Sequence, residues 1–248
     1  MLILLPPSET KATRKRGRPM ALERLSFPGL QATREQVAVA LAKVSEQPDA
    51  TDQLGVSANL ADEVARNTRL RTAAALRASS LYTGVLYDAL DHAGLGAAAR
   101  RRAHRSIVVV SALYGALRLT DSVAPYRLSM ATNLPGIGPL ASAWREPLER
   151  VLPEAAGRGV VVDCRSSTYA AAWTPRGSLA ERWVQVRVPG ATHMAKHTRG
   201  LVARHLCEVG GDPRTPAALA DTVARAFDVE LHEPARPGRA WVLDAVAR

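Results

Sequence analysis

Cysteine, aromatic residues and long apolar runs are all scarce in this sequence. Its 248 residues include two cysteines and only 4% aromatic residues. Two cysteines exclude a disulfide-dense secreted scaffold, and we expect Cys164 and Cys207 to be buried as small apolar side chains. No stretch approaches the ~20 apolar residues of a membrane span. The N-terminal apolar run is too short for a signal peptide, and no basic region precedes it. We therefore expect a soluble, cytoplasmic protein without membrane contact.

Several catalytic and metal-binding patterns are also missing. There is no G-x-x-x-x-G-K-[ST] phosphate loop and no serine in a glycine-flanked elbow. His193 and His197 have the i, i+4 spacing of a zinc helix. However, Met194 stands where a protease motif would have glutamate, and no third ligand is evident. No Cys/His cluster suits iron either. We therefore expect no metal site and no cofactor.

The charge is strongly basic, with 33 Lys and Arg against 23 Asp and Glu, a net charge of +10. Such a balance favours polyanionic partners such as nucleic acid or nucleotides. Arginine runs occur at 14–18 and 100–105. Because arginine and alanine are abundant throughout, as in proteins from GC-rich genomes, the charge alone is weak evidence for a polyanionic partner.

Strand and helix patterns alternate along the chain, which predicts an α/β fold. Thr33 is the expected N-cap of a mostly helical region, 33–78, and a further helix is expected between Gly84 and Gly94. The expected strands are 2–5, 106–115, 160–164, 182–188 and 239–246, and the other expected helices are 192–210 and 215–227. No repeat or linker divides the chain. We expect a single domain, 1–248, with a mixed central sheet wrapped by helices and a basic cleft.

Polar residues follow three of the aliphatic strands directly. They are Ser8, Glu9, Thr10 and Lys11; Tyr114, Asp121, Tyr126 and Arg127; and Asp163, Arg165, Ser166, Ser167 and Tyr169. Ligands of α/β sheets bind beyond the carboxyl ends of the strands. If the three strands are parallel, the three groups should share one cleft. Alternatively, each group only caps a helix or pairs with its neighbour.

Five segments resemble the YaaA family of peroxide stress resistance proteins in order and spacing. They are "LLPPSETK", "YTGVLYDAL", "SALYGALRLTDSVAPYRLSM", "VVVDCRSSTYAAAW" and "AKHTRGLVARHL", and together they extend over nearly the whole chain. The resemblance implies a single α/β domain with a basic cleft, DNA binding, and a role in limiting peroxide damage by lowering free iron. Family members with "SPAKT" carry lysine where this chain has Glu9, whereas Thr10 matches.

The stretch "LPGIGPLASAW", residues 134–144, fits the hairpin of a helix-hairpin-helix motif. There, Gly136 and Gly138 would let the backbone approach a phosphate, and Pro139 would be the first helical residue. The preceding "RLSMATN" lacks a helical pattern, however. The alternative is a turn that only starts the helix carrying Trp144.

The late helix predicts a second basic surface. At 100° per residue, His193, Lys196, His197 and Arg204 lie on one side of it, opposite an apolar side. A solvated surface helix is the alternative. Tyr82 and Arg199, which lie in the motifs quoted above, are further candidates for ligand contact.

Two functional hypotheses follow. The first is a protein that binds DNA or another polyanion electrostatically, with little sequence preference. The second is an enzyme acting on a nucleotide, nucleoside or modified base, with Glu9, Asp121 and Asp163 as candidate proton-transfer groups. In both, Arg127 should pair with Asp121 or Asp163. A purely structural interaction protein explains the polar groups least well.

The sequence does not determine whether the protein is an enzyme, which nucleic acid it binds or in which oligomeric state it exists. The full set of expected binding residues is Ser8, Thr10, Lys11, Tyr82, Tyr114, Tyr126, Arg127, Gly136, Gly138, Ser166, Ser167, Tyr169, Lys196 and Arg199.

Overall fold

A seven-stranded sheet forms the centre of the computed structural model, which describes residues 1–190 and 194–248. The strand order is β10-β11-β9-β8-β1-β3-β4. The strands are β1 (Leu2–Leu5), β3 (Ile107–Ser111), β4 (Gly115–Arg118), β8 (Val161–Asp163), β9 (Trp183–Arg187), β10 (Phe227–His232) and β11 (Trp241–Ala247). Two small pairs lie outside it, β2 (Leu76–Arg77) with β5 (Ser122–Val123), and β6 (Asn133–Leu134) with β7 (Gly138–Pro139). The predicted α/β class with a mixed central sheet is confirmed.

The five inner strands are parallel, and the two edge strands are antiparallel to them. β1 pairs in parallel with β3 on one side and with β8 on the other, and β8, β9 and β11 continue in the same direction. β4 and β10 form the two edges of the sheet and run antiparallel to the inner strands. The carboxyl ends of β1, β3 and β8 therefore lie next to one another at one edge of the sheet.

The central strands are mostly aliphatic because helices and loops cover both faces of the sheet, and only Ser111 and Asp163, at the ends of β3 and β8, are polar. Every residue of β1, β3 and β8 is buried. β9 alternates more, with Gln185 half-buried and Arg187 exposed, as its mixed pattern predicts. Cys164 and Cys207 are both buried and free, and burial raises the pKa of each thiol to about 12.

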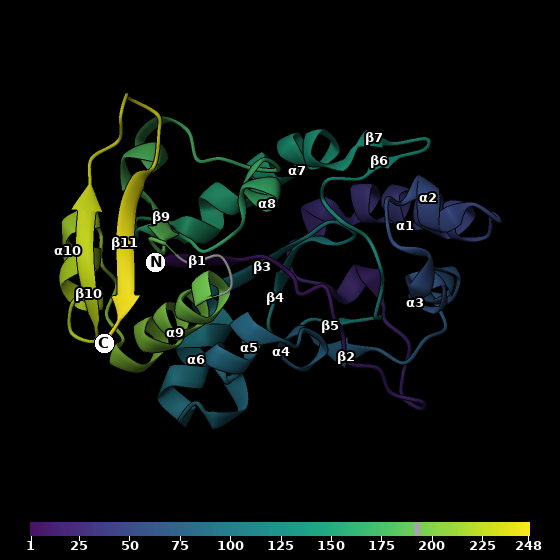
Figure 1. The fold of residues 1–248 in the computed structure, drawn as a ribbon, viewed down its shortest axis with the longest axis horizontal. Helices are drawn as coiled ribbons and strands as arrows, with labels where there is room; N and C mark the ends of the chain where they lie inside the picture. The colour runs from purple at the N-terminus through teal and green to yellow at the C-terminus, as the bar shows by residue number, and fades with distance from the viewer. Residues whose placement is uncertain (191–193) are drawn as a thin grey trace.

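The helices form layers around the sheet and an extension beyond one end of it. In Figure 1, α5, α6 and α9 lie below the strands, α7 and α8 lie above them, and α1–α3 occupy the end of the molecule opposite β10. The bounds are α1 Gln31–Ser45, α2 Ala50–Gln53, α3 Ala61–Ala65, α4 Ala78–Leu81, α5 Val85–Leu90, α6 Ala97–Ser106, α7 Leu140–Ala156, α8 Ser167–Ala170, α9 Met194–Val209 and α10 Pro216–Val223. α9 packs closely on α5 because Gly200 faces the Leu86 carbonyl, where a Cβ would clash. Within the described ranges, no helix is both long and apolar enough to span a membrane.

Several predicted boundaries are wrong. Thr33 is not an N-cap, because α1 begins at Gln31 after a short turn over Pro28–Leu30. The helix after Gly84 ends at Leu90, where Asp91 takes a left-handed backbone conformation, so Gly94 caps only a following turn. The expected helix 215–227 is shorter, because Phe227 already starts β10, a strand that the sequence patterns did not indicate.

Candidate functional site

A pocket of about 260 Å³ lies at the carboxyl edge of β1 and β8. We call it the edge pocket. Its walls come from four segments that are far apart in sequence: residues 6–10, residues 83–87, the tail of β8 with Cys164, Ser166 and Tyr169, and Lys196 and Arg199 of α9. The tails of β1 and β8 thus meet as expected. The tail of β3 does not line the edge pocket, and only Tyr126 and Arg127 reach the neighbouring loop, at Lys11 and at the Glu9 carbonyl.

The loop after β1 is fastened to the segment that enters α5. The Thr83 amide donates to Ser8 Oγ at 3.1 Å, and the Tyr87 hydroxyl donates to the Pro6 carbonyl at 2.6 Å. Lys11 and Tyr82 form an isolated antiparallel bridge. Thr83 and Tyr87 lie in a motif that the resemblance includes, but residue types alone did not mark them as pocket residues. Their role in shaping the loop follows only from the packing.

Glu9 and Lys196 face each other where the edge pocket opens to solvent. Lys196 Nζ donates to Glu9 Oε1 at 3.0 Å, and both side chains are more than half exposed. Partial burial would raise the pKa of Glu9, but a hydrogen bond to its own backbone, the hydrogen bond from Lys196 and the charges of Lys196 and Lys11 lower it overall. Glu9 is therefore ionised at neutral pH, and the pair neutralises charge at the entrance.

Lys11 lies beside the edge pocket, partly covered by the loop that carries Glu9. Its Nζ donates to the carbonyls of Ser8 and Glu9, at 2.7 and 3.3 Å, and stands 4.4 Å from the centre of the Tyr126 ring. Burial lowers the pKa of Lys11 to about 7, and the charge of Arg127 contributes further. The contacts with the two carbonyls and with the Tyr126 ring stabilise the protonated amine, but they do not compensate for its loss of hydration. A large fraction of this amine is neutral at pH 7.

The tyrosines form a buried cluster under Lys11. Tyr126 contacts Ser111 Oγ through its hydroxyl at 2.7 Å and the Tyr82 hydroxyl at 3.4 Å, and Tyr114 packs edge-on against the Tyr126 ring. Burial raises the pKa of all three hydroxyls well above 10. They stay neutral at physiological pH and serve as a rigid apolar support. Tyr114 has no exposed surface and bonds the Ala124 carbonyl, so it lies in the core rather than in the edge pocket.

Arg127 pairs with a carboxylate, but not with the expected one. Its Nη1 lies 3.2 Å from Glu63 Oε2 and also contacts the Glu9 carbonyl at 3.3 Å. The prediction of Asp121 or Asp163 is wrong because α3, which carries Glu63, packs beside the 124–132 segment. Glu63 gave no signal in the sequence, since it stands in an alanine-rich helical stretch.

Asp163 and Asp121 are both occupied by structural contacts. Asp163 forms a two-bond pair with Arg165, at 2.7 and 2.8 Å, and also accepts from Trp183 Nε1. Both members of this pair are almost fully buried. Asp121 accepts from the amides of Ser26 and Arg118 and from the Ser26 hydroxyl. The alternative in which each carboxylate pairs with its neighbouring arginine is therefore confirmed for Asp163 and Arg165. Asp121 instead accepts from the amide of Arg118 and not from its guanidinium.

The remaining predicted residues divide between the edge pocket and the surface. Ser166, Tyr169, Lys196 and Arg199 line the edge pocket, whereas Ser167 is exposed and outside its walls. Burial raises the pKa of Tyr169 to about 12. Arg199 donates through Nε to the Val186 carbonyl at 3.1 Å. His193, expected on the basic side of α9, lies outside the described residues.

The hairpin at 133–139 is present, but the helix expected before it is not. Residues 124–132, all of which the structure describes, contain no helix, and Pro139 ends β7 as the N-cap of α7 instead of beginning the helix. Gly136 and Gly138 have the left-handed backbone that a tight hairpin needs. Gly136 lines a separate groove against α1. The helix-hairpin-helix interpretation therefore has only half of its elements.

The two arginine runs differ in position. Arg14, Lys15, Arg16 and Arg18 are exposed on a loop that leaves the edge pocket at Lys11. We call residues 12–18 the basic loop. It is held at both ends, where the Ala12 amide donates to the Leu81 carbonyl and the Ala75 amide donates to the Arg18 carbonyl. The run at 100–105 lies in α6, which leads into the amino end of β3 and so sits at the opposite edge.

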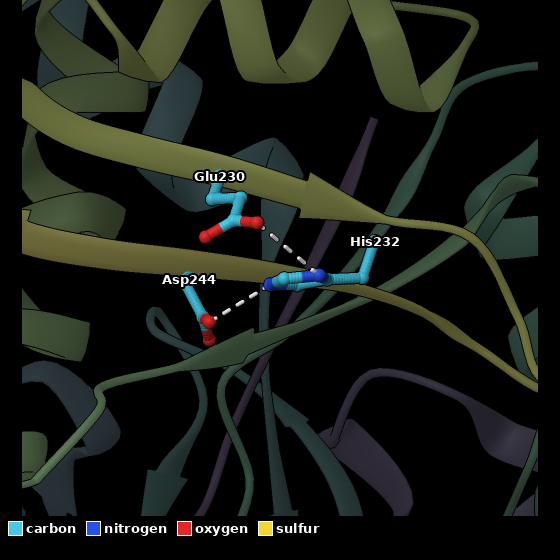
Figure 2. Close-up of side chains that lie close together, drawn as sticks. All are labelled: Glu230, His232 and Asp244. Carbon is cyan, nitrogen blue, oxygen red and sulfur yellow. Dashed lines mark hydrogen bonds and ion pairs between the residues drawn. The ribbon is translucent and has the colours of Figure 1, made fainter.

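A cluster of Glu230, His232 and Asp244 lies on β10 and β11, which β9 separates from the strands of the edge pocket. Figure 2 shows the His232 ring between the two carboxylates. His232 Nε2 is 2.9 Å from Asp244 Oδ2, and Arg187 also bonds both oxygens of Asp244. The hydrogen bond from Arg187, with smaller help from His232, lowers the pKa of Asp244. Because the guanidinium already neutralises this carboxylate, the cluster is best described as an ion-pair network.

Comparison with known proteins places this geometry in a family. Residues 1–231 match the family described as peroxide stress protein YaaA. A UPF0246 protein of Streptomyces coelicolor is 48% identical over 255 residues, which cover 99% of this chain and 98% of that protein. UPF0246 proteins of Corynebacterium efficiens and Corynebacterium glutamicum are 36% and 35% identical, covering 94% and 83% of this chain and 96% and 84% of their own lengths. The chain therefore belongs to the YaaA family of peroxide stress proteins.

Proposed function

We propose that this protein binds DNA through the edge pocket and the adjoining basic loop, and that it does so in the cytoplasm during peroxide stress. The observation that carries the proposal is the exposed run of Arg14, Lys15, Arg16 and Arg18, directly connected to the edge pocket through Lys11. None of these four side chains is engaged in an ion pair among the described residues. When such unpaired cations contact phosphates, the DNA releases its condensed counterions, which favours binding.

The carboxylates near the edge pocket do not oppose this function. Glu9 is neutralised by Lys196 and Glu63 by Arg127. Asp121 and Asp163 are held by amides and by Arg165, so they do not face a ligand as free charges. We therefore expect the unpaired cations of the basic loop to attract the phosphates of DNA. Contacts of this kind bind phosphates without reading base edges, so we expect weak sequence preference.

The alternative is an enzyme acting on a nucleotide, nucleoside or modified base. One observation supports this alternative. The edge pocket is enclosed on several sides, and its lining includes Ser166, Tyr169 and Arg199. A pocket of about 260 Å³ lies just below the usual size range of ligand pockets, so it suits a small group such as a single base. In this reading, the basic loop holds the phosphates and the edge pocket holds the base.

A salt titration of DNA binding tests the proposal. Affinity for a duplex should fall steeply with salt, and replacing Arg14, Lys15, Arg16 and Arg18 by alanine should lower the slope of log K against log salt by up to about 0.9 per lost phosphate contact. The matched control removes the same charge elsewhere, at the exposed residues Arg101, Arg145, Arg225 and Arg236. Equal losses in both variants would show that only net charge matters and would reject this interface.

A further inference from the structure

Lysine is rare in this chain, and one lysine differs from the rest. The 33 cationic side chains include only four lysines, Lys11, Lys15, Lys43 and Lys196. The last three are exposed, whereas Lys11 is mostly covered. Arginine does not lose its proton in proteins, so an arginine at position 11 would remain a cation. Among the basic groups of this edge, Lys11 is therefore the one best placed to present a neutral amine.

Among the described residues, no carboxylate forms an ion pair with Lys11. The two nearest carboxylates are used by other cations, Glu63 by Arg127 and Glu9 by Lys196. Arg127 Nη1 and Lys11 Nζ both lie 3.3 Å from the same Glu9 carbonyl oxygen, which brings the two cations close together. A lysine that is desolvated and placed next to another cation is a recognised form of activated amine nucleophile.

The groups facing Lys11 come from four segments, and each has a defined charge state. Arg127 is cationic, and Glu9 and Glu63 are each paired with another cation. Tyr82 and Tyr126 are neutral, because burial raises the pKa of both hydroxyls. The pKa of Lys11, lowered to about 7 by burial and by Arg127, makes its amine available at neutral pH. An exposed lysine, with an ordinary pKa near 10.4, is almost fully protonated there.

We propose that Lys11 forms a covalent imine with an aldehyde, and that its substrate is the ring-opened sugar of a base-free site in DNA. This substrate rests on the proposed DNA binding, because the basic loop that begins at Ala12 would hold the flanking phosphates beside Lys11. A sugar without a base leaves its C1′ aldehyde uncovered. The nitrogen lone pair attacks that carbon, the carbonyl electrons move to oxygen, which takes up a proton, and the nitrogen loses one. Loss of water from the carbinolamine then yields the imine.

Borohydride trapping tests the proposal on the full-length protein. A labelled duplex with one base-free site is incubated with the protein and reduced, and covalent product is measured on a denaturing gel beside an intact duplex. We expect product with the base-free duplex alone, at least tenfold less for Lys11→Arg, and an unchanged amount for Lys43→Arg, a control at an exposed lysine of α1 outside the proposed binding surface. The yield of covalent product should increase with pH, with a midpoint near pH 7, because the amine of Lys11 must be neutral to react. Peptide mass analysis of the unaltered protein should place the adduct on Lys11, which makes the assignment independent of how the variants fold.

The outcomes separate the imine from DNA binding itself. Fluorescence anisotropy with the intact duplex, without borohydride, measures binding alone. If the duplex binds but no product forms, or if the adduct spreads over Lys15, Lys43 and Lys196, the imine is rejected and DNA binding stands. If neither duplex binds but 2-deoxyribose 5-phosphate is trapped at Lys11, the nucleophile is supported and DNA as its substrate is overturned.

Discussion

Asn67 binds both backbone groups of Arg127. Its Nδ2 donates to the Arg127 carbonyl at 2.9 Å, and its Oδ1 accepts from the Arg127 amide at 2.8 Å. Asn67 is fully buried and also donates to Ser45 Oγ at 3.1 Å. A side chain from the short turn that follows α3 thus provides the hydrogen bonds that a neighbouring strand would give to the irregular segment carrying Arg127. This contact orients Arg127 toward Glu63 and the Glu9 carbonyl.

Replacing Asn67 by alanine should destabilise the fold. The change leaves an amide and a carbonyl of Arg127 without partners in a largely buried position, which costs about 2–4 kcal/mol in the free energy of unfolding. Urea denaturation measures this loss, with the exposed Asn133→Ala as control. A loss as small as that of the control would mean that water replaces the contact.

Removing the Arg127 side chain should affect binding more than stability. Its partner Glu63 is 29% exposed, so the pair contributes about 1 kcal/mol or less to the free energy of unfolding. We expect Arg127→Ala to unfold near the parent's urea midpoint but to bind DNA several-fold more weakly. Arg127→Lys should recover only part of the affinity, since an ammonium is a point charge without the planar fork of the guanidinium. Unchanged anisotropy curves for both variants would place Arg127 outside the interface.

Breaking the buried pair of Asp163 and Arg165 should be far more damaging. Asp163→Asn leaves the guanidinium buried without a counter-charge, at a cost of about 3–5 kcal/mol. Calorimetric melting of Asp163→Asn and of the double variant Asp163→Asn/Arg165→Gln measures the effect. The double variant should recover part of the loss, because it removes the stranded charge. If the double variant shows no recovery, the loss of stability comes mainly from the hydrogen bonds to Tyr169, Trp173 and Trp183 and not from the unpaired charge.

Neutralising Glu9 should strengthen DNA binding. Glu9 holds Lys196 at 3.0 Å, so Glu9→Gln breaks the ion pair and releases the Lys196 ammonium to contact phosphate. We expect a rise in affinity of roughly two- to tenfold at low salt, shrinking as salt screens the charges. Glu146→Gln, which removes an exposed partner of Arg150 on α7, is the control. A rise of equal size in the control would point to net charge alone.

The pH dependence of stability should report the state of Lys11. Its pKa is about 7 in the folded protein against an ordinary 10.5, so between these values the unfolded chain binds more protons. Unfolding free energy therefore rises with pH through this window, relative to a variant without the amine. We expect the difference between the parent and Lys11→Met to grow in the parent's favour from pH 7 to pH 10, as measured by urea unfolding. A constant difference would mean that Lys11 titrates as an exposed lysine.

The sequence by itself determined the α/β class and the edge of the sheet at which the polar tails of β1 and β8 gather. These features follow from local patterns. Runs such as "LILL" and "SIVVV" indicate strands buried on both faces, and polar residues directly after a buried strand must emerge at its carboxyl end. The resemblance to the YaaA family rested on short motifs in order, which the comparisons confirmed over residues 1–231.

Only the tertiary structure decided the strand order, the partner of Arg127 and the surroundings of Lys11. Glu63 and Asn67 reach Arg127 across about sixty residues, and neither has a local pattern that marks it. The hairpin at 133–139 was visible in its glycines, but the irregular backbone before it depends on long-range contacts such as those of Asn67 with the Arg127 backbone. Lys11 is an unremarkable lysine in a polar loop until Tyr126 and Arg127 are placed beside it. Charge state depends on desolvation and on neighbouring charges, and both are set by segments that meet only when the chain is folded.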